Sequence, residues 1–124
     1  MAIDATGVNI GGFGYQTKED ISASTLTTDL NDSGKVLNFT ATCVVTLHAV
    51  ADGETLTFRV GAPGITLTLS PAAADGIKGC DNTGTDNKDI VFTNQPVGSF
   101  VTLVGGNADA WVISAVSGAF TAEA

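Results

Sequence analysis

The chain contains one histidine, His48, which is the residue type best suited to acid–base chemistry near neutral pH. Asp52 follows four positions later, a spacing at which a carboxylate could orient the imidazole of a general base. No Gly-x-Ser-x-Gly motif or other activated nucleophile accompanies this pair. We therefore interpret His48 as an ordinary surface residue at the end of a strand, and we predict that the protein is not an enzyme.

The potential metal ligands are few. His48 and two distant cysteines, Cys43 and Cys80, fall short of the four ligands of a zinc site, so no transition metal is predicted. Oxygen ligands that suit calcium gather in one loop: Asp81, Asn82, Asp86, Asn87 and Asp89. Their spacing does not match an EF-hand, and we prefer a solvated, turn-rich loop with calcium as an open alternative. No cofactor is predicted.

Two further segments suggest ligands only weakly. Gly11-Gly12-Phe13-Gly14 lacks the Gly-Lys-Ser/Thr ending of a phosphate-binding loop. Trp111 could stack on a sugar ring, but its apolar neighbours favour a packing role. Cys43 and Cys80 are interpreted as separate thiols, because two cysteines do not make a disulfide framework, although a bridge between them stays open.

The charge of the chain excludes two classes of partner. It has 13 acidic residues against five lysines and arginines, giving a net charge of -8. Nucleic acids and anionic membrane surfaces are bound through basic residues, so neither is a predicted partner. The sequence has no apolar run long enough to span a membrane and no basic-then-apolar segment at its start. We therefore expect synthesis in a host cytoplasm.

The elements that position these residues are predicted to be β-strands. Between Val44 and Pro71, apolar residues alternate with threonine or charged residues, which gives each strand one buried and one exposed face. Turns at Asp52-Gly53 and Pro63-Gly64 divide this stretch into a predicted meander of three antiparallel strands. The meander is expected to bury one set of apolar residues: Cys43, Val45, Leu47, Leu56, Phe58, Val60, Ile65, Leu67 and Leu69.

Shorter elements are predicted on either side of the meander. Ala23–Thr28 and Lys35–Thr40 flank the turn Asn31-Asp32-Ser33-Gly34 and are expected to form a hairpin. Thr17–Asp20 allow at most one helical turn. A long irregular segment, Pro71–Asp89, precedes another strand at Asp89–Thr93.

The last two predicted strands, Ser99–Val104 and Trp111–Val116, are apolar on both faces. Phe100 lies on one face of its strand, while Val101 and Leu103 lie on the other. Strands of this kind must be covered on both sides, either by a second sheet of the same molecule or by an identical neighbour. We favour the neighbour.

The predicted domain organisation is an N-terminal arm, residues 1–20, and one all-β domain, residues 21–124. The arm is rich in glycine and carries Phe13 and Tyr15, rings that we expect to dock on a neighbour or on the domain itself. A domain of this size can bury a sizeable core. The predicted fold is a single antiparallel β-sandwich, jelly-roll-like domain or small barrel.

The order of these motifs resembles that of small all-β virion structural proteins of tailed bacteriophages, which include head decoration (cement) proteins, tail fibres and tailspikes. The matching segments are Val45-Thr46-Leu47, Gly53–Phe58, Ile65–Pro71, Asp75–Gly79, Ser99–Leu103 and Trp111-Val112-Ile113 before Gly118. The chain departs from this pattern at His48, where proline is common, and at Phe120, where tryptophan is common.

Among these virion proteins, the size of the chain favours the capsid decoration proteins. Fibre and spike proteins usually carry such a domain among long repeats, whereas one domain with an arm is similar to a stand-alone capsid decoration protein. The resemblance implies a homotrimer on the capsid surface of the virion that bridges subunits of the major capsid protein. Binding only to the expanded shell would stabilise that shell by mass action.

The resemblance also suggests roles for particular residues. Phe13 and Tyr15 are the candidates for capsid contact, and a second group is assigned to subunit contact or core: Phe100, Val101, Leu103 and Trp111. The alternative function is a receptor- or carbohydrate-binding module at a tail or fibre tip. That module would use the loop Pro71–Asp89, with Trp111 as a further candidate.

Overall fold

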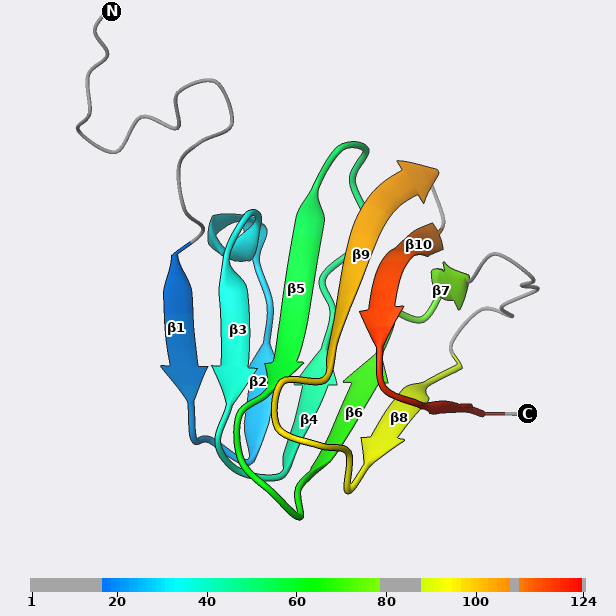
Figure 1. Ribbon diagram of the computed structural model, residues 1–124. Helices are drawn as coiled ribbons and strands as arrows, with labels where there is room; N and C mark the ends of the chain where they lie inside the picture. Colours follow the sequence, from blue (N-terminus) through cyan, green and yellow to red (C-terminus); the bar gives the residue numbers. More distant parts are fainter. Residues whose placement is uncertain (1–16, 79–87, 108–109, 124) are drawn as a thin grey trace, which may run out of the picture.

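Figure 1 shows the computed structural model of the chain, which describes residues 17–78, 88–107 and 110–123. These residues form two β-sheets, and they contain no α-helix. The six-stranded sheet has the order β1 (Lys18–Ile21), β3 (Val36–Phe39), β5 (Thr55–Val60), β9 (Phe100–Asn107), β10 (Ala110–Ser117), β7 (Gly76–Lys78). The five-stranded sheet has the order β11 (Thr121–Ala122), β8 (Ile90–Thr93), β6 (Thr66–Ser70), β4 (Cys43–Thr46), β2 (Thr25–Thr27).

The first six strands alternate between the two sheets. Strands β1, β3 and β5 pair in parallel in one sheet, and β2, β4 and β6 pair in parallel in the other. The chain thus winds through three successive coils, and equivalent residues such as Ile21, Phe39 and Val60 stack in register. Strands β8 and β9 then pair antiparallel with β6 and β5, so both sheets are mixed.

This winding confirms the all-β class but corrects the predicted strand pairing. The sheets are mixed rather than antiparallel, and the predicted hairpin is wrong because β2 and β3 lie in different sheets. The predicted meander is wrong for the same reason, since β4 and β6 are parallel neighbours while β5 belongs to the other sheet. Alternation with a period of two determines which face of a strand is buried, but it does not determine the neighbouring strand.

Smaller elements also differ from the predictions. Lys18–Ile21 form strand β1 where one helical turn was the most expected, and this strand begins inside the range predicted for the arm. The predicted tight turn contains instead a short 3₁₀ helix, η2 (Leu30–Asp32), which Asp29 caps. Strand β7 lies within the segment predicted to be irregular. Phe13 and Tyr15 lie outside the described residues, as do residues 79–87 of the loop.

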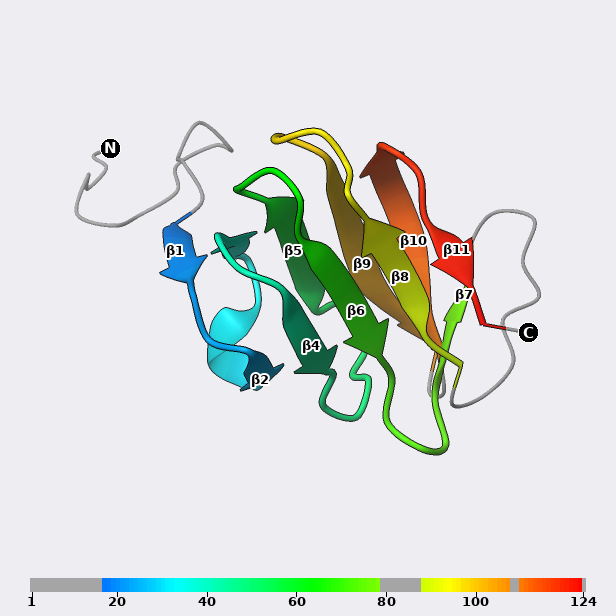
Figure 2. The same ribbon diagram turned by 90° about the horizontal axis from the view of Figure 1, so that it is seen from below.

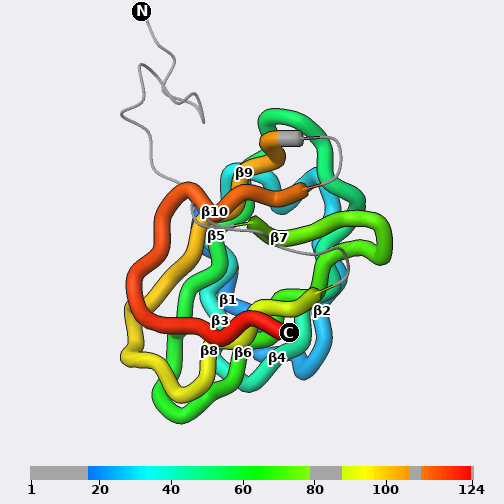
Figure 3. Tube along the Cα trace, turned by 90° about the vertical axis from the view of Figure 1, so that its right-hand side faces the viewer, coloured from blue at the N-terminus to red at the C-terminus, as the bar shows by residue number. Residues whose placement is uncertain are grey.

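The core lies between the two sheets, which form two layers in Figures 2 and 3. All nine residues that were predicted to be buried together are buried, although they come from both layers. Phe39 and Phe58 meet there with ring centroids 6.1 Å apart. Burial of each such side chain contributes about 1.5–3 kcal/mol before the entropy of ordering is subtracted.

Gly105 marks a close approach between β9 and the connection from β4 to β5. Its N–H donates to the carbonyl oxygen of Glu54 at 2.8 Å, and its carbonyl accepts from the N–H of Gly53 at 2.9 Å. A Cβ atom at Gly105 would lie 1.9 Å from the backbone oxygen of Ala51. The backbone would therefore have to move to accommodate any side chain.

We expect Gly105→Ala to destabilise the domain by about 1–3 kcal/mol, the usual cost of overpacking, or by more. Gly106→Ala is the matched control, because the nearest atom to its Cβ would be Cγ2 of the Val112 side chain, at 3.0 Å, and no backbone atom would lie closer than 4.0 Å. Urea unfolding of both variants measures the difference. Equal midpoints for the two variants would contradict the close approach at Gly105.

Candidate functional site

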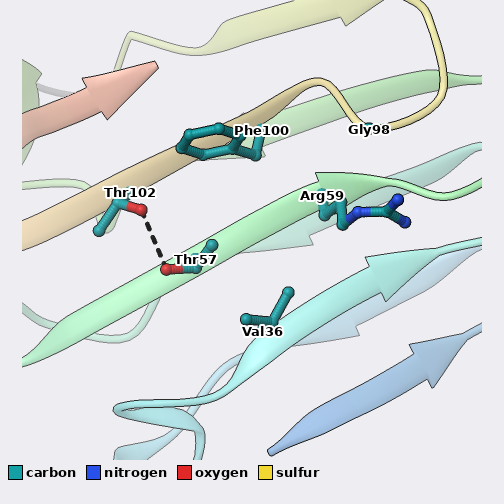
Figure 4. Close-up of a pocket in the computed structure, with 6 residues that line it drawn as sticks. All are labelled: Val36, Thr57, Arg59, Gly98, Phe100 and Thr102. Carbon is teal, nitrogen blue, oxygen red and sulfur yellow. Dashed lines mark hydrogen bonds between the residues drawn. The ribbon is translucent and has the colours of Figure 1, made fainter. Parts of the chain in front are cut away.

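The six-stranded sheet carries a groove on its outer face, the side that points away from the five-stranded sheet. The groove has a volume of about 310 Å³ and is lined by Val36, Thr57, Arg59, Gly98, Phe100 and Thr102 (Figure 4). Strand register explains this grouping, because Val36 pairs with Thr57, Thr57 with Thr102, and Arg59 with Phe100. Cross-strand partners point to the same side of a sheet, so β3, β5 and β9 present these side chains together.

Arg59 is the only arginine of the chain, and a polar relay orients it. Its Nη1 atom donates to Oδ1 of Asn38, and Nδ2 of Asn38 donates to Oδ1 of Asp20 at 3.0 Å. Asn38 is only 5% exposed, and its amide fills the space beside Gly61, where a Cβ would lie 2.5 Å from Nδ2. The relay therefore links β1, β3 and β5 and holds the guanidinium against the groove.

Asp20, at the outer end of this relay, has a pKa below its usual value. The main cause is the hydrogen bond from Asn38, followed by that from Lys18, which lies 3.2 Å away. Both bonds favour the carboxylate over the carboxylic acid. The relay therefore ends in an anion that accepts from Asn38 and leaves the amide oxygen of Asn38 free to accept from Arg59.

The groove combines groups that suit anion binding beside an apolar surface. Two partly exposed apolar side chains, Val36 and Phe100, lie in it with the hydroxyls of Thr57 and Thr102, which are 3.0 Å apart. The Nε and Nη2 atoms of Arg59 have no partner among the described residues. A planar guanidinium with free donors is well matched to a carboxylate, which it can bind through two parallel hydrogen bonds.

His48 lies in a different polar cluster, and its predicted surface placement is wrong. Its Nδ1 atom lies 2.7 Å from the hydroxyl of Thr28, and its Nε2 atom lies 2.7 Å from Oε1 of Glu54. The histidine side chain is 18% exposed and that of Glu54 is 8% exposed. The carboxylate partner is therefore Glu54, and Asp52 lies exposed in the turn. The ring of Trp111 packs edge-on against the imidazole at a centroid distance of 5.5 Å.

The Thr28, His48 and Glu54 cluster has the connectivity of a hydroxyl–imidazole–carboxylate triad, but its hydroxyl and its carboxylate are buried. Thr28 is 2% exposed, and its hydroxyl oxygen also accepts the backbone N–H of His48 at 3.0 Å. None of the three residues lines the groove. The cluster instead ties the segments that follow β2 and β4 to the start of β5, so we assign it a structural role.

The residues predicted for subunit contact or core divide into two groups. Val101, Leu103 and Trp111 are completely buried between the sheets, which leaves Trp111 no surface for stacking on a sugar. Phe100 points to the outer face and lines the groove. Sequence reasoning missed Arg59 and Asn38. The available signal was that the only arginine of an acidic chain occupies an outward position of an alternating strand.

Other predicted ligands are only partly within the described ranges. Among residues 17–78, 88–107 and 110–123, no three His, Cys, Asp or Glu side chains are placed to hold a metal ion. Four of the five potential calcium ligands, as well as Cys80, lie outside these ranges. Cys43 is a free, buried thiol whose pKa is raised by burial. None of the described residues forms a helix long and apolar enough to cross a membrane.

No protein-family model matches this chain, and no curated protein matches it either. Its function must therefore be inferred from its own residues and their arrangement.

Proposed function

We propose that the protein is a capsid decoration protein of a tailed bacteriophage, which binds the outer shell as a homotrimer and stabilises contacts between major capsid subunits. The observation that carries this proposal is the outer face of β9 and β10. Phe100, Val104 and Val112 remain partly exposed there, while Val101, Leu103 and Trp111 on the inner face of the same strands are completely buried. An apolar sheet face of this kind favours burial against another molecule.

The arrangement of the motifs supports the same proposal. The six segments that resemble virion proteins each contain one strand: β4, β5, β6, β7, β9 and β10. In this proposal the domain is a β-sandwich whose mixed sheets provide a rigid block. Rigid blocks lose little conformational entropy when they assemble.

The proposed mechanism requires only that the protein binds the shell, and it involves no chemical reaction. A protein that binds the expanded shell and not the unexpanded one stabilises the expanded form by about 2.7 kcal/mol when its free concentration is 100 times Kd. The net charge of -8 is compatible with a partner that is a protein surface rather than DNA. The arm, with Phe13 and Tyr15, is our candidate for capsid contact.

Mixing the purified protein with undecorated shells, before and after expansion, tests this function by electron microscopy. We expect density with threefold symmetry on expanded shells and none on unexpanded shells. Absence of density on both kinds of shell would refute the proposal. A variant that lacks residues 1–15 is expected to lose shell binding, and unchanged binding would show that the arm assignment is wrong.

The alternative function, a receptor- or carbohydrate-binding module at a fibre tip, is favoured by the composition of the groove. Phe100, Arg59 and two threonine hydroxyls offer an apolar ring and several hydrogen-bonding groups in one concave surface. A glycan panel separates this function from decoration, because only a glycan-binding module would retain a sugar. A calcium-dependent rise in melting temperature would further favour the alternative.

A further inference from the structure

We propose that the groove around Arg59 is the seat for an acidic turn of a second copy of this chain. The inference rests on the self-association that the proposed function includes, and it names the surfaces that make the contact. In this arrangement the groove of one copy receives the turn Asp29-Leu30 of the next copy. Such a head-to-tail contact can close into a ring, which a trimer requires.

Arg59 differs from most other cations of the described chain in forming no close ion pair, although it interacts with the carboxylate of Asp20 at longer range. Lys18 and Lys35 each lie 3.2 Å from a carboxylate oxygen, and Lys88 lies 4.0 Å from that of Glu123. Arg59 instead donates to the neutral amide of Asn38, and its Nε and Nη2 atoms stay available. Its guanidinium can therefore bind a carboxylate from outside the molecule in bidentate geometry.

The strands that line the groove carry no acidic residue on their outer face, although the exposed carboxylate of Asp20, on the edge strand β1, interacts with the charge of Arg59. The outward positions of β3, β5, β9 and β10 that align with the groove are Val36, Asn38, Thr55, Thr57, Arg59, Phe100, Thr102, Val104, Val112, Ala115 and Ser117. Asp20, on the edge strand β1, is the nearest carboxylate in this register, and Asn38 and Lys18 already engage it. Two copies of charge -8 repel each other, and this repulsion is weakest where one copy presents few carboxylates.

The turn at Asp29 and Leu30 offers the chemistry that the groove lacks. Leu30 is 68% exposed, more than the other exposed large hydrophobic residues of the described ranges, Val44, Val97 and Val116. Asp29 beside it is exposed, and a capping box with Asp32 holds the turn in a defined shape. An apolar side chain next to a carboxylate complements a groove in which Val36 and Phe100 lie beside Arg59. A pre-ordered turn also loses little entropy on docking.

Sedimentation velocity of variants over a concentration series tests the contact. We expect Arg59→Gln, which can still donate to Asn38, to weaken self-association at least about tenfold, and we expect Arg59→Glu to abolish it. Lys88→Glu is the matched control, because it makes the same charge change outside the six-stranded sheet and removes only an exposed ion pair. In the turn that is proposed to enter the groove, Leu30→Ser is expected to abolish self-association, while Val44→Ser at another exposed position leaves it unchanged.

A mixture of Arg59→Glu with Leu30→Ser provides a direct test of the pairing. Each variant retains the surface that the other has lost, so the mixture is expected to form a dimer through one intact contact, whereas each variant alone stays monomeric. Circular dichroism confirms that the variants are folded. The inference is overturned if both Arg59 variants associate as the Lys88→Glu control does, or if the mixture stays monomeric at the highest concentration at which the wild type associates.

Measuring shell binding together with self-association shows whether the groove contact or the proposed function is wrong. If Arg59→Glu loses shell binding but keeps its self-association, the groove faces the shell, and the inference fails while the function stands. If the wild type associates through the groove but binds no shell, the inference stands and the function fails.

Discussion

Replacing Trp111 with alanine is expected to lower the free energy of unfolding by about 3–5 kcal/mol, the usual cost of truncating a large buried aromatic residue. Trp111 is 0% exposed, and its strand, β10, lies between β9 and β7. Its removal leaves a cavity and also takes away the ring that packs against His48. Denaturant unfolding followed by circular dichroism measures the loss.

Two controls make this result specific to packing. Trp111→Phe keeps an aromatic ring and removes an indole N–H that is buried without a partner in the described part of the chain, so it should cost less than Trp111→Ala. Val116→Ala, at a position 43% exposed, should change stability by less than about 1 kcal/mol. If Trp111→Ala reduced self-association without changing the unfolding of the monomer, Trp111 would be a subunit contact and its place in the core would be wrong.

Replacing His48 with leucine is expected to cost about 3 kcal/mol or more, because it leaves the buried carboxylate of Glu54 without its hydrogen-bond partner. The second oxygen of Glu54, Oε2, is already buried with no partner among the described residues, so the loss of His48 would leave both oxygens unpaired there. The hydroxyl of Thr28 would also lose its contact with Nδ1 of the imidazole. Urea unfolding at neutral pH measures this effect.

The double variant His48→Leu/Glu54→Leu separates loss of the pair from loss of packing. Replacing both members of a buried polar pair with apolar residues is often close to neutral, so the double variant should recover much of the stability that His48→Leu loses. A His48→Leu variant that unfolds within about 0.5 kcal/mol of the wild type would show that the cluster contributes little to stability.

Local patterns in the sequence predicted the strands and their buried faces, but not which strands lie side by side. The alternation from Cys43 to Leu69 identified the strands and their buried faces, because a pleated strand presents every second residue to one side. The same alternation fits a meander and a coil that passes from sheet to sheet, so it could not reveal that β4 pairs with β6. Strand β7 has only three residues, too few to show a period.

The groove was harder to predict than the core, since it depends on register across three strands. Thr57 and Thr102 are 45 positions apart and become neighbours only because β5 and β9 pair antiparallel. The partner of His48 was missed for a related reason. Asp52 and Glu54 are both close to it in sequence, and the turn directs Glu54 inward while Asp52 stays exposed.

Sedimentation velocity of the wild-type chain from high to low concentration decides whether the protein is a self-associating structural component. We expect a particle of three times 12.5 kDa that dissociates on dilution. A single species of 12.5 kDa at every concentration would contradict both the trimer and the role assigned to the outer face of the six-stranded sheet.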